Sequence, residues 1–208
     1  MKIAACLSGA CLLLAATGTQ VAAAGLEYRV RIEAPEELEA MLRSGLNLVR
    51  WQNDPEMTEE QLERLVDEAV REAREVAATE GYFSARVESS IDRASEPATV
   101  RLRIEPGERT RVADVQLRLS GPAAQDAQAR ERLEQVRENW TLRAGMAFRQ
   151  EDWDAAKAQA LSELAGWRYA AAQIGASRAL IDPDTRQARL SVEIASGPPF
   201  RFGPIQVS

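Results

Sequence analysis

The sequence predicts an α+β fold made of two tandem β-α-α-β-β units, each a three-stranded mixed sheet covered on one face by two helices. A repeat at a spacing of 90 residues is the first observation behind this prediction, because a fixed period indicates one supersecondary unit used in series. The aligned pairs are Gly107 with Gly197, Arg111 with Arg201 and Gln116 with Gln206. The second observation is that apolar residues alternate in short segments, and the third is that they recur at three and four residues in longer ones.

The first repeat opens with a predicted strand over residues 26–33, where every second residue is apolar. A short helix is expected from Pro35 to near Gly45, because proline fits the first helical turn. Thr58 and Gln61 form the pattern of a capping box at the start of a long amphipathic helix that Gly81 ends. A hairpin follows, with strands over 83–91 and 100–104 around a turn at 93–97.

The second repeat shows the same order of elements. A strand over residues 115–119 leads to a predicted helix over 124–138, and a second helix is predicted over 150–165. The closing hairpin has alternating residues from 170 to 174, a turn at 182–184 and a last strand over 188–194. The connection between the repeats, residues 105–109, is so short that we expect a stiff pair.

These patterns divide the chain into four parts. Residues 1–24 have a charged start, an apolar stretch and a small-residue cleavage site after Ala24, which is the pattern of a secretory signal peptide. Residues 25–107 and 108–197 are the two predicted units. Residues 198–208 repeat the start of a unit, so we expect them to be the first strand of an incomplete third unit.

Composition argues against several function classes. The chain has no histidine, and both cysteines, Cys6 and Cys11, lie in the predicted signal peptide, so we expect neither thiol chemistry nor a histidine metal site. The sequence holds 26 basic and 32 acidic residues with no basic run, which makes nucleic acid an unexpected partner. Nucleophile and phosphate-loop motifs are absent from the sequence, so we predict no enzyme, no catalytic residue and no cofactor.

Three groups of residues invite functional interpretations that we weigh against structural ones. Trp51, Trp140, Trp153 and Trp167 favour core packing over ligand stacking. The acidic residues of the helix after Thr58 are expected on its solvated face, not at a metal. Asp182 and Asp184 flank Pro183 in a turn, and acid–base catalysis by this pair is the catalytic alternative.

The βααββ repeat resembles the POTRA domains that precede the outer-membrane β-barrels of the Omp85 superfamily. The supporting motifs are residues 81–85, residues 196–205, and Trp153 with Lys157 and Leu161 on one helix. Within the superfamily the resemblance is strongest to the TamA family of translocation and assembly modules. The segment Gly166-Trp167-Arg168-Tyr169 departs from the Gly-Tyr-Phe pattern of the first repeat.

The resemblance implies an exported protein at the periplasmic face of the outer membrane, anchored in its full-length form by a C-terminal barrel that this chain lacks. Its implied role is a scaffold for protein assembly or translocation. The implied partners are outer-membrane or autotransporter client polypeptides and a TamB-like inner-membrane-anchored protein. Alternatives within the superfamily are the central barrel-assembly subunit and a two-partner secretion transporter. A stand-alone periplasmic adaptor is the alternative outside it.

The architecture points to sheet edges as the binding elements. In such a unit the last strand is expected at the centre of the sheet and the penultimate strand at the rim, where unpaired backbone groups can add a partner strand. Arg86 and Arg178 also fit a role as guards against such pairing. The candidate partner-binding residues are Phe83, Ser84, Ala85, Arg86 and Val87 in the first repeat and Tyr169, Ala170, Ala171, Ala172, Gln173 and Ile174 in the second.

Overall fold

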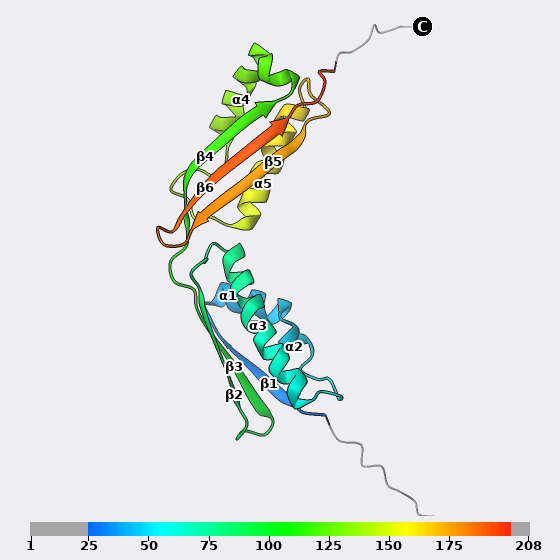
Figure 1. Ribbon diagram of the computed structural model, residues 1–208, viewed down its shortest axis with the longest axis vertical. Coiled ribbons are helices and arrows are strands. Elements are labelled where there is room, and N and C mark those ends of the chain that lie inside the picture. The colour runs from blue at the N-terminus through cyan, green and yellow to red at the C-terminus, as the bar shows by residue number, and fades with distance from the viewer. Residues whose placement is uncertain (1–24, 201–208) are drawn as a thin grey trace, which may run out of the picture.

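A computed structural model describes residues 25–200 as two three-stranded sheets, each with its own helices (Figure 1). We call the elements up to β3 the first unit and those from β4 onward the second unit. The first unit contains β1 (Tyr28–Glu33), α1 (Glu36–Gly45), α2 (Asn47–Arg50), α3 (Glu59–Thr79), β2 (Arg86–Asp92) and β3 (Ala98–Glu105). The second contains β4 (Arg111–Ser120), the 3₁₀ helix η1 (Pro122–Gln125), α4 (Ala127–Asn139), α5 (Gln150–Ala165), β5 (Gln173–Asp182) and β6 (Gln187–Ala195).

Both sheets have the predicted mixed topology. Their strand orders are β1-β3-β2 and β4-β6-β5, with the first pair parallel and the second antiparallel in each sheet. The first and last strands pair in parallel because the two intervening helices carry the chain back across the sheet. The predicted α+β class is therefore confirmed.

Each unit has its own apolar core between its sheet and its helices. In the first, alternate residues of β3 such as Val100 and Leu102 are fully buried against Leu62 and Ala69 of α3. In the second, Leu190 and Val192 of β6 pack with residues of α4 and α5 such as Leu133. Figure 1 shows the helices on one side of each sheet, which leaves the other face of the sheet uncovered.

The local signals in the sequence place most elements correctly. The Thr58 side chain accepts from Gln61 N at 3.2 Å and Gln61 Oε1 accepts from Thr58 N at 2.8 Å, so the predicted capping box is present. Helix α5 covers the residues predicted for it.

The short helix α2 was not predicted, and the helix predicted from Ala124 begins at Ala127. It begins there because Pro122 opens a 3₁₀ turn and Asp126 caps α4.

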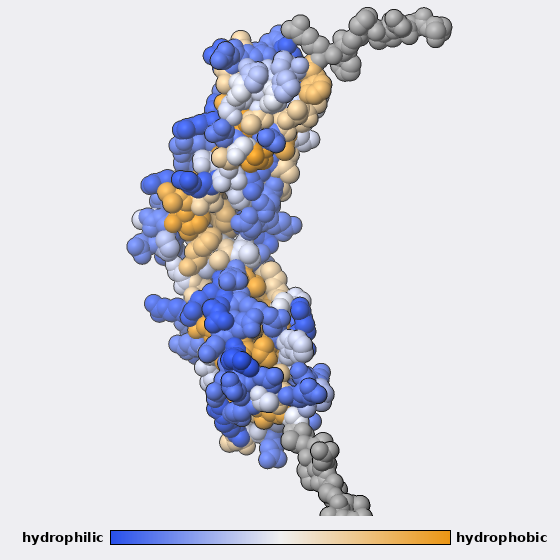
Figure 2. Space-filling view, turned by 45° about the vertical axis from the view of Figure 1, so that its right-hand side comes forward, coloured by the Kyte–Doolittle hydropathy of each residue, from blue (hydrophilic) through white to orange (hydrophobic). Residues whose placement is uncertain are grey.

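Charge is distributed unevenly between the two halves of the chain. Residues 25–107 contain 11 basic and 19 acidic residues, whereas residues 108–200 contain 13 of each. Hydrophilic residues accordingly dominate the first unit in Figure 2, and larger apolar areas lie on the second. Among residues 25–200, no helix combines the length and apolarity that a bilayer span requires. The predicted signal peptide and residues 201–208 lie outside the described residues.

Candidate functional site

The rim strands β2 and β5 are the candidate binding elements. Each is paired on one side only, with β3 and β6 respectively, as the sequence predicts for penultimate strands. Along the described chain, the free side of each strand therefore presents backbone N–H and C=O groups that no neighbouring strand uses. Such a border can add an extended polypeptide as a further strand.

The rim strands begin later than the sequence predicts. Four candidate residues lie in them, namely Arg86, Val87, Gln173 and Ile174. The other seven precede them, namely Phe83, Ser84, Ala85, Tyr169, Ala170, Ala171 and Ala172. The two strand starts were placed wrongly because the alternating pattern continues through segments that tertiary contacts hold out of the sheet.

The β2 border is short and charged. It has seven residues, of which Arg86, Glu88 and Asp92 carry charges. Beyond its end, Arg93 forms ion pairs with Glu59 at 2.5 Å and Glu63 at 2.8 Å, which tie the hairpin turn to the start of α3. Charges at the rim disfavour pairing with another strand.

The β5 border is longer and carries fewer charges. It has ten residues, and only Arg178 and Asp182 are charged. A bulge at Gly175 interrupts the register between Ile174 and Ala176. Leu180 is 57% exposed. Ile174 is half-buried, as are Ala179 and Ile181 on the same strand, because no strand covers the core beyond them.

A shallow groove of about 470 Å³ runs beside β5 on the uncovered face of the second sheet. It is lined by Gln116, Arg118, Ala176, Ser177, Arg178, Ser191, Val192 and Glu193. The lining includes the small side chains of Ala176, Ser177 and Ser191. Arg118 and Glu193 are opposite each other in the register of β4 and β6. The groove offers both hydrogen-bond donors and hydrogen-bond acceptors.

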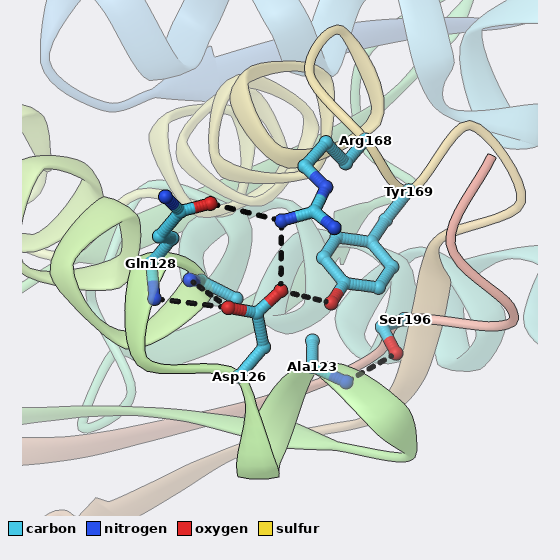
Figure 3. Close-up of polar contacts among 7 residues, drawn as sticks. Ala123, Asp126, Gln128, Arg168, Tyr169 and Ser196 are labelled. Carbon is cyan, nitrogen blue, oxygen red and sulfur yellow. Dashed lines mark hydrogen bonds and ion pairs between the residues drawn. The ribbon is translucent and has the colours of Figure 1, made fainter. Parts of the chain in front are cut away.

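The residues before β5 are held by a polar cluster (Figure 3). The Tyr169 hydroxyl donates to Asp126 Oδ2 at 2.9 Å, and Arg168 Nη1 lies 3.2 Å from the same oxygen. The other oxygen, Asp126 Oδ1, accepts from Gln128 N at 2.9 Å at the start of α4. Tyr169 is 1% exposed, so this bond and its burial explain why the segment leaves the sheet.

The pKa shifts in this cluster come from burial and from hydrogen bonds within the cluster, which fits a structural role. The hydrogen bond from Tyr169, followed by those from the backbone, lowers the pKa of Asp126. Burial, and then the bond to Asp126, raises the pKa of Tyr169. Nearby, Ser196 Oγ accepts from Ala123 N at 3.1 Å (Figure 3). The cluster fixes three segments together.

The segment before β2 forms the contact between the units. Phe83 lies 5.8 Å from Phe148 between ring centroids and packs against the core of the second unit. Thr110 N donates to Gly81 O at 2.9 Å, and Phe148 N donates to Thr110 O at 2.8 Å. Gly81 has φ +88°, and a Cβ there would collide with the carbonyl oxygen of Phe148. The sequence motif Gly-Tyr-Phe is therefore an inter-unit contact and not the start of a strand.

Charged groups surround this contact. Glu80 is 6% exposed and pairs with Arg149 at 2.8 Å and Arg109 at 3.6 Å. Arg109 also pairs with Glu37 at 3.1 Å and lies over the Tyr82 ring at 4.9 Å. A buried carboxylate needs such partners, because an unpaired one would be strongly destabilising. No local sequence pattern indicates this network, because its members are far apart along the chain.

Two of the four tryptophans are in the core, as predicted. Trp140 and Trp153 are each 4% exposed and pack edge to face. For Trp51 and Trp167 the prediction was wrong, because they are 49% and 38% exposed. Trp51 lies beside a groove of about 330 Å³ between the loop before Thr58 and α3.

The acidic side chains of α3 take ordinary structural roles. Glu68 and Glu72 accept hydrogen bonds from the Asn47 side chain at 3.2 and 2.7 Å. Over residues 25–200, no group of three or more acidic side chains is arranged to hold a metal ion. Asp182 accepts from Asp184 N at 3.1 Å and Thr185 N at 3.2 Å, and hydrogen bonds from Thr185 lower its pKa, so the turn interpretation is confirmed.

The first unit is similar to a known protein family. Residues 23–106 match the family model described as POTRA domain TamA domain 1. The comparison with curated proteins gives no match.

Solved structures with a similar arrangement come from bacteria and share little sequence with this chain. The crystal structure of BamA POTRA3-5 from Haemophilus influenzae matches with 14% identity and a TM-score of 0.43, over 84% of this chain and 67% of that one. POTRA1-2 of Omp85 from Anabaena matches with 14% identity and a TM-score of 0.41, over 84% and 96%. CdiB from Escherichia coli matches with 11% identity and a TM-score of 0.35, over 88% of this chain and 29% of CdiB.

Proposed function

We propose that this chain is a POTRA region of an Omp85-superfamily protein and forms the periplasmic scaffold of a TamA-like outer-membrane assembly or translocation factor. POTRA domains of Omp85 proteins are periplasmic scaffolds that bind client polypeptides. The match to a model of TamA domain 1 supports a TamA-like factor over a central barrel-assembly subunit. The scaffold has no catalytic role in this proposal. A TamB-like inner-membrane-anchored protein is its proposed stable partner.

The scaffold holds polypeptides by β-augmentation, and β5 is the proposed main border. The observation that carries this choice is the contrast between the two rims. The β5 border has ten residues with two charges, whereas the β2 border has seven residues with three charges. Exposed edge strands with fewer charged guards pair more readily with other strands.

The side chains around β5 favour a partner strand that alternates between apolar and polar residues. Ala179 and Ile181 are half-buried at the border of the core, so apolar side chains of an added strand would cover them. On the other face the added strand would meet Arg178 and the polar groove beside it. Outer-membrane and autotransporter strands are the proposed clients, because transmembrane β-strands have this alternation.

A photo-crosslinking experiment with paired positions tests the choice of border. We place a photoreactive residue at Leu180 on the rim strand or at Arg189, its register partner on the central strand β6. An extended peptide of alternating apolar and polar residues should crosslink to position 180. Position 189 is the matched control, because it faces the same side of the sheet. Equal yields at both positions would indicate binding to the sheet face and contradict pairing at the border.

Amide hydrogen exchange gives a second readout that binding through side chains alone would not produce. Added strands bond to every second residue of the rim strand. The peptide should therefore slow exchange at alternating β5 amides and leave β2 amides unchanged. Protection confined to β2 would move the site to the first unit, and uniform or absent protection would reject augmentation altogether.

A further inference from the structure

Trp51 and Trp140 stand at corresponding places in the two units but differ in exposure. Each directly follows a helix, Trp51 after α2 and Trp140 after α4. Trp140 is buried, packs edge to face on Trp153 and donates its indole N–H to Leu142 O at 2.8 Å. Trp51, in contrast, is 49% exposed. The second unit therefore uses its tryptophan in the core, whereas the first unit presents its tryptophan to solvent.

The apolar core of the first unit is formed without the Trp51 ring. The fourth residue of α5 is Trp153, whereas the fourth residue of α3 is Leu62, which is buried. Leu48 of α2 is also buried, and its carbonyl oxygen accepts from the Tyr28 hydroxyl at 2.7 Å. The packing of α2 and α3 therefore does not explain why a tryptophan stands at position 51.

The groove of about 330 Å³ beside Trp51 has an apolar part and a fixed wall. Met57 and Leu65 are its other apolar lining residues. The loop that carries Trp51 and Met57 is held by backbone bonds, because Asp54 N donates to Trp51 O at 3.1 Å and Met57 N donates to Leu-facing Asp54 O at 3.3 Å. A groove with a fixed wall lowers the entropic cost of binding, and tryptophan is among the residue types that contribute most at interfaces.

The charge around this groove is mainly acidic. Asp54 and Glu68 line it, and Arg64 is the one cation among its lining residues. Glu72 lies one turn beyond Glu68 on α3. Residues 25–107 as a whole contain 11 basic and 19 acidic residues. Carboxylates next to an exposed aromatic ring are complementary to a cation, which can lie on the ring face and pair with a carboxylate at the same time.

We propose that this groove binds a cationic segment of a partner polypeptide. An arginine or lysine of the partner lies on the Trp51 ring and pairs with Asp54 and Glu68, and a neighbouring apolar side chain contacts Met57 and Leu65. The site lies between the loop and α3 on the helical side of the first sheet (Figure 1). The inference is independent of strand addition at β5, which belongs to the second unit.

Two capped pentapeptides test the proposal, acetyl-Gly-Leu-Arg-Arg-Gly-amide and the control acetyl-Gly-Leu-Glu-Glu-Gly-amide. They share their length and apolar side chain and differ in charge. Indole N–H signals of the nitrogen-15-labelled chain are followed by NMR, and Trp51→Phe identifies the signal of Trp51. At millimolar concentration the arginine peptide should shift this signal saturably, and the glutamate peptide should not. Trp167, which is 38% exposed in the second unit, is the internal control for non-specific contact.

Charge variants separate binding in the groove from general attraction to an acidic protein. Asp54→Asn with Glu68→Gln keeps the side-chain oxygens that accept hydrogen bonds within the fold and should weaken binding of the arginine peptide by about fivefold to tenfold. Glu75→Gln with Glu88→Gln removes two exposed charges outside the lining and should change the affinity by less than about twofold. Arg64→Gln should strengthen binding, because it removes the cation from the lining.

Four results would overturn the proposal. They are equal shifts with the two peptides, equal shifts of the Trp51 and Trp167 signals, equal weakening in the two double variants, and no shift of the Trp51 signal at millimolar peptide. Tighter binding of the glutamate peptide would also contradict it and would make Arg64 the binding group.

Discussion

At the scale of single residues, Tyr28 shows how a buried polar group couples stability to pH. It is 2% exposed, and its hydroxyl donates to Leu48 O at 2.7 Å, which ties β1 to α2. Burial, with a smaller effect of the Asp54 charge, raises the pKa of Tyr28 from 10.0 to about 12. The neutral phenol is the form that the fold stabilises.

The resulting pH dependence has a definite sign. Because the folded pKa lies above the unfolded one, the contribution of Tyr28 is complete below pH 10 and is lost as pH rises toward about 12. Urea unfolding of the first unit should therefore show a fall in stability across this window. Tyr28→Phe should lower stability at neutral pH by about 1 kcal/mol, through the lost hydrogen bond, and should weaken the alkaline fall. An undiminished alkaline fall in the variant would assign the effect to another group.

At the scale of elements, α3 is the best defined helix because local signals act together. It has a capping box at Thr58, acidic residues in its first turn and a buried stripe that includes Leu62 and Ala69. Thr58→Ala should cost about 1 kcal/mol of unfolding free energy, because the Gln61 N–H loses its side-chain acceptor. Thr58→Ser keeps the acceptor and is the matched control. Denaturant unfolding monitored at helix wavelengths measures both, and equal losses would contradict a capping role.

The rim strands show where local signals fail at the same scale. Alternation in the sequence continues from Phe83 into β2 and from Ala170 into β5, so pattern alone extends both strands too far. Phe83 is withdrawn by its contact with Phe148, and Tyr169 by its bond to Asp126. The two rim strands can be predicted from the sequence pattern. Their starts cannot, because the competing partners lie 65 and 43 residues away.

At the scale of the whole molecule, the contact at Gly81 connects the units by packing as well as by the chain. It combines a backbone bond between Gly81 and Thr110, a ring pair and the Glu80 ion pairs. Glycine is required at position 81 for two reasons. Its φ is positive, and the carbonyl oxygen of Phe148 leaves no room for a Cβ. Gly145 has nearly the same φ, +87°, but a Cβ there would meet no part of the described chain within 4 Å beyond its immediate neighbours, so this glycine provides a matched control.

Gly81→Ala should therefore change how the two units pack against each other, whereas Gly145→Ala should introduce only local backbone strain. Spin labels at Glu75→Cys on α3 and Ala155→Cys on α5, with Cys6 and Cys11 replaced by serine, report the distance by double electron–electron resonance. The distance distribution should broaden or shift for Gly81→Ala and stay unchanged for Gly145→Ala. Identical distributions in both variants would show that the contact at Gly81 does not set the arrangement.

The sequence by itself determined the class of fold, the order of the elements, the capping box at Thr58 and the position of β2 and β5 at the rims. These properties follow from periodicity, turn residues and caps, which act over a few residues. Only the tertiary structure decided that the Gly-Tyr-Phe motif joins the units, that Trp51 and Trp167 are exposed, and where the rim strands begin. Such outcomes depend on which distant groups compete for the same side chain, and no local pattern records that competition.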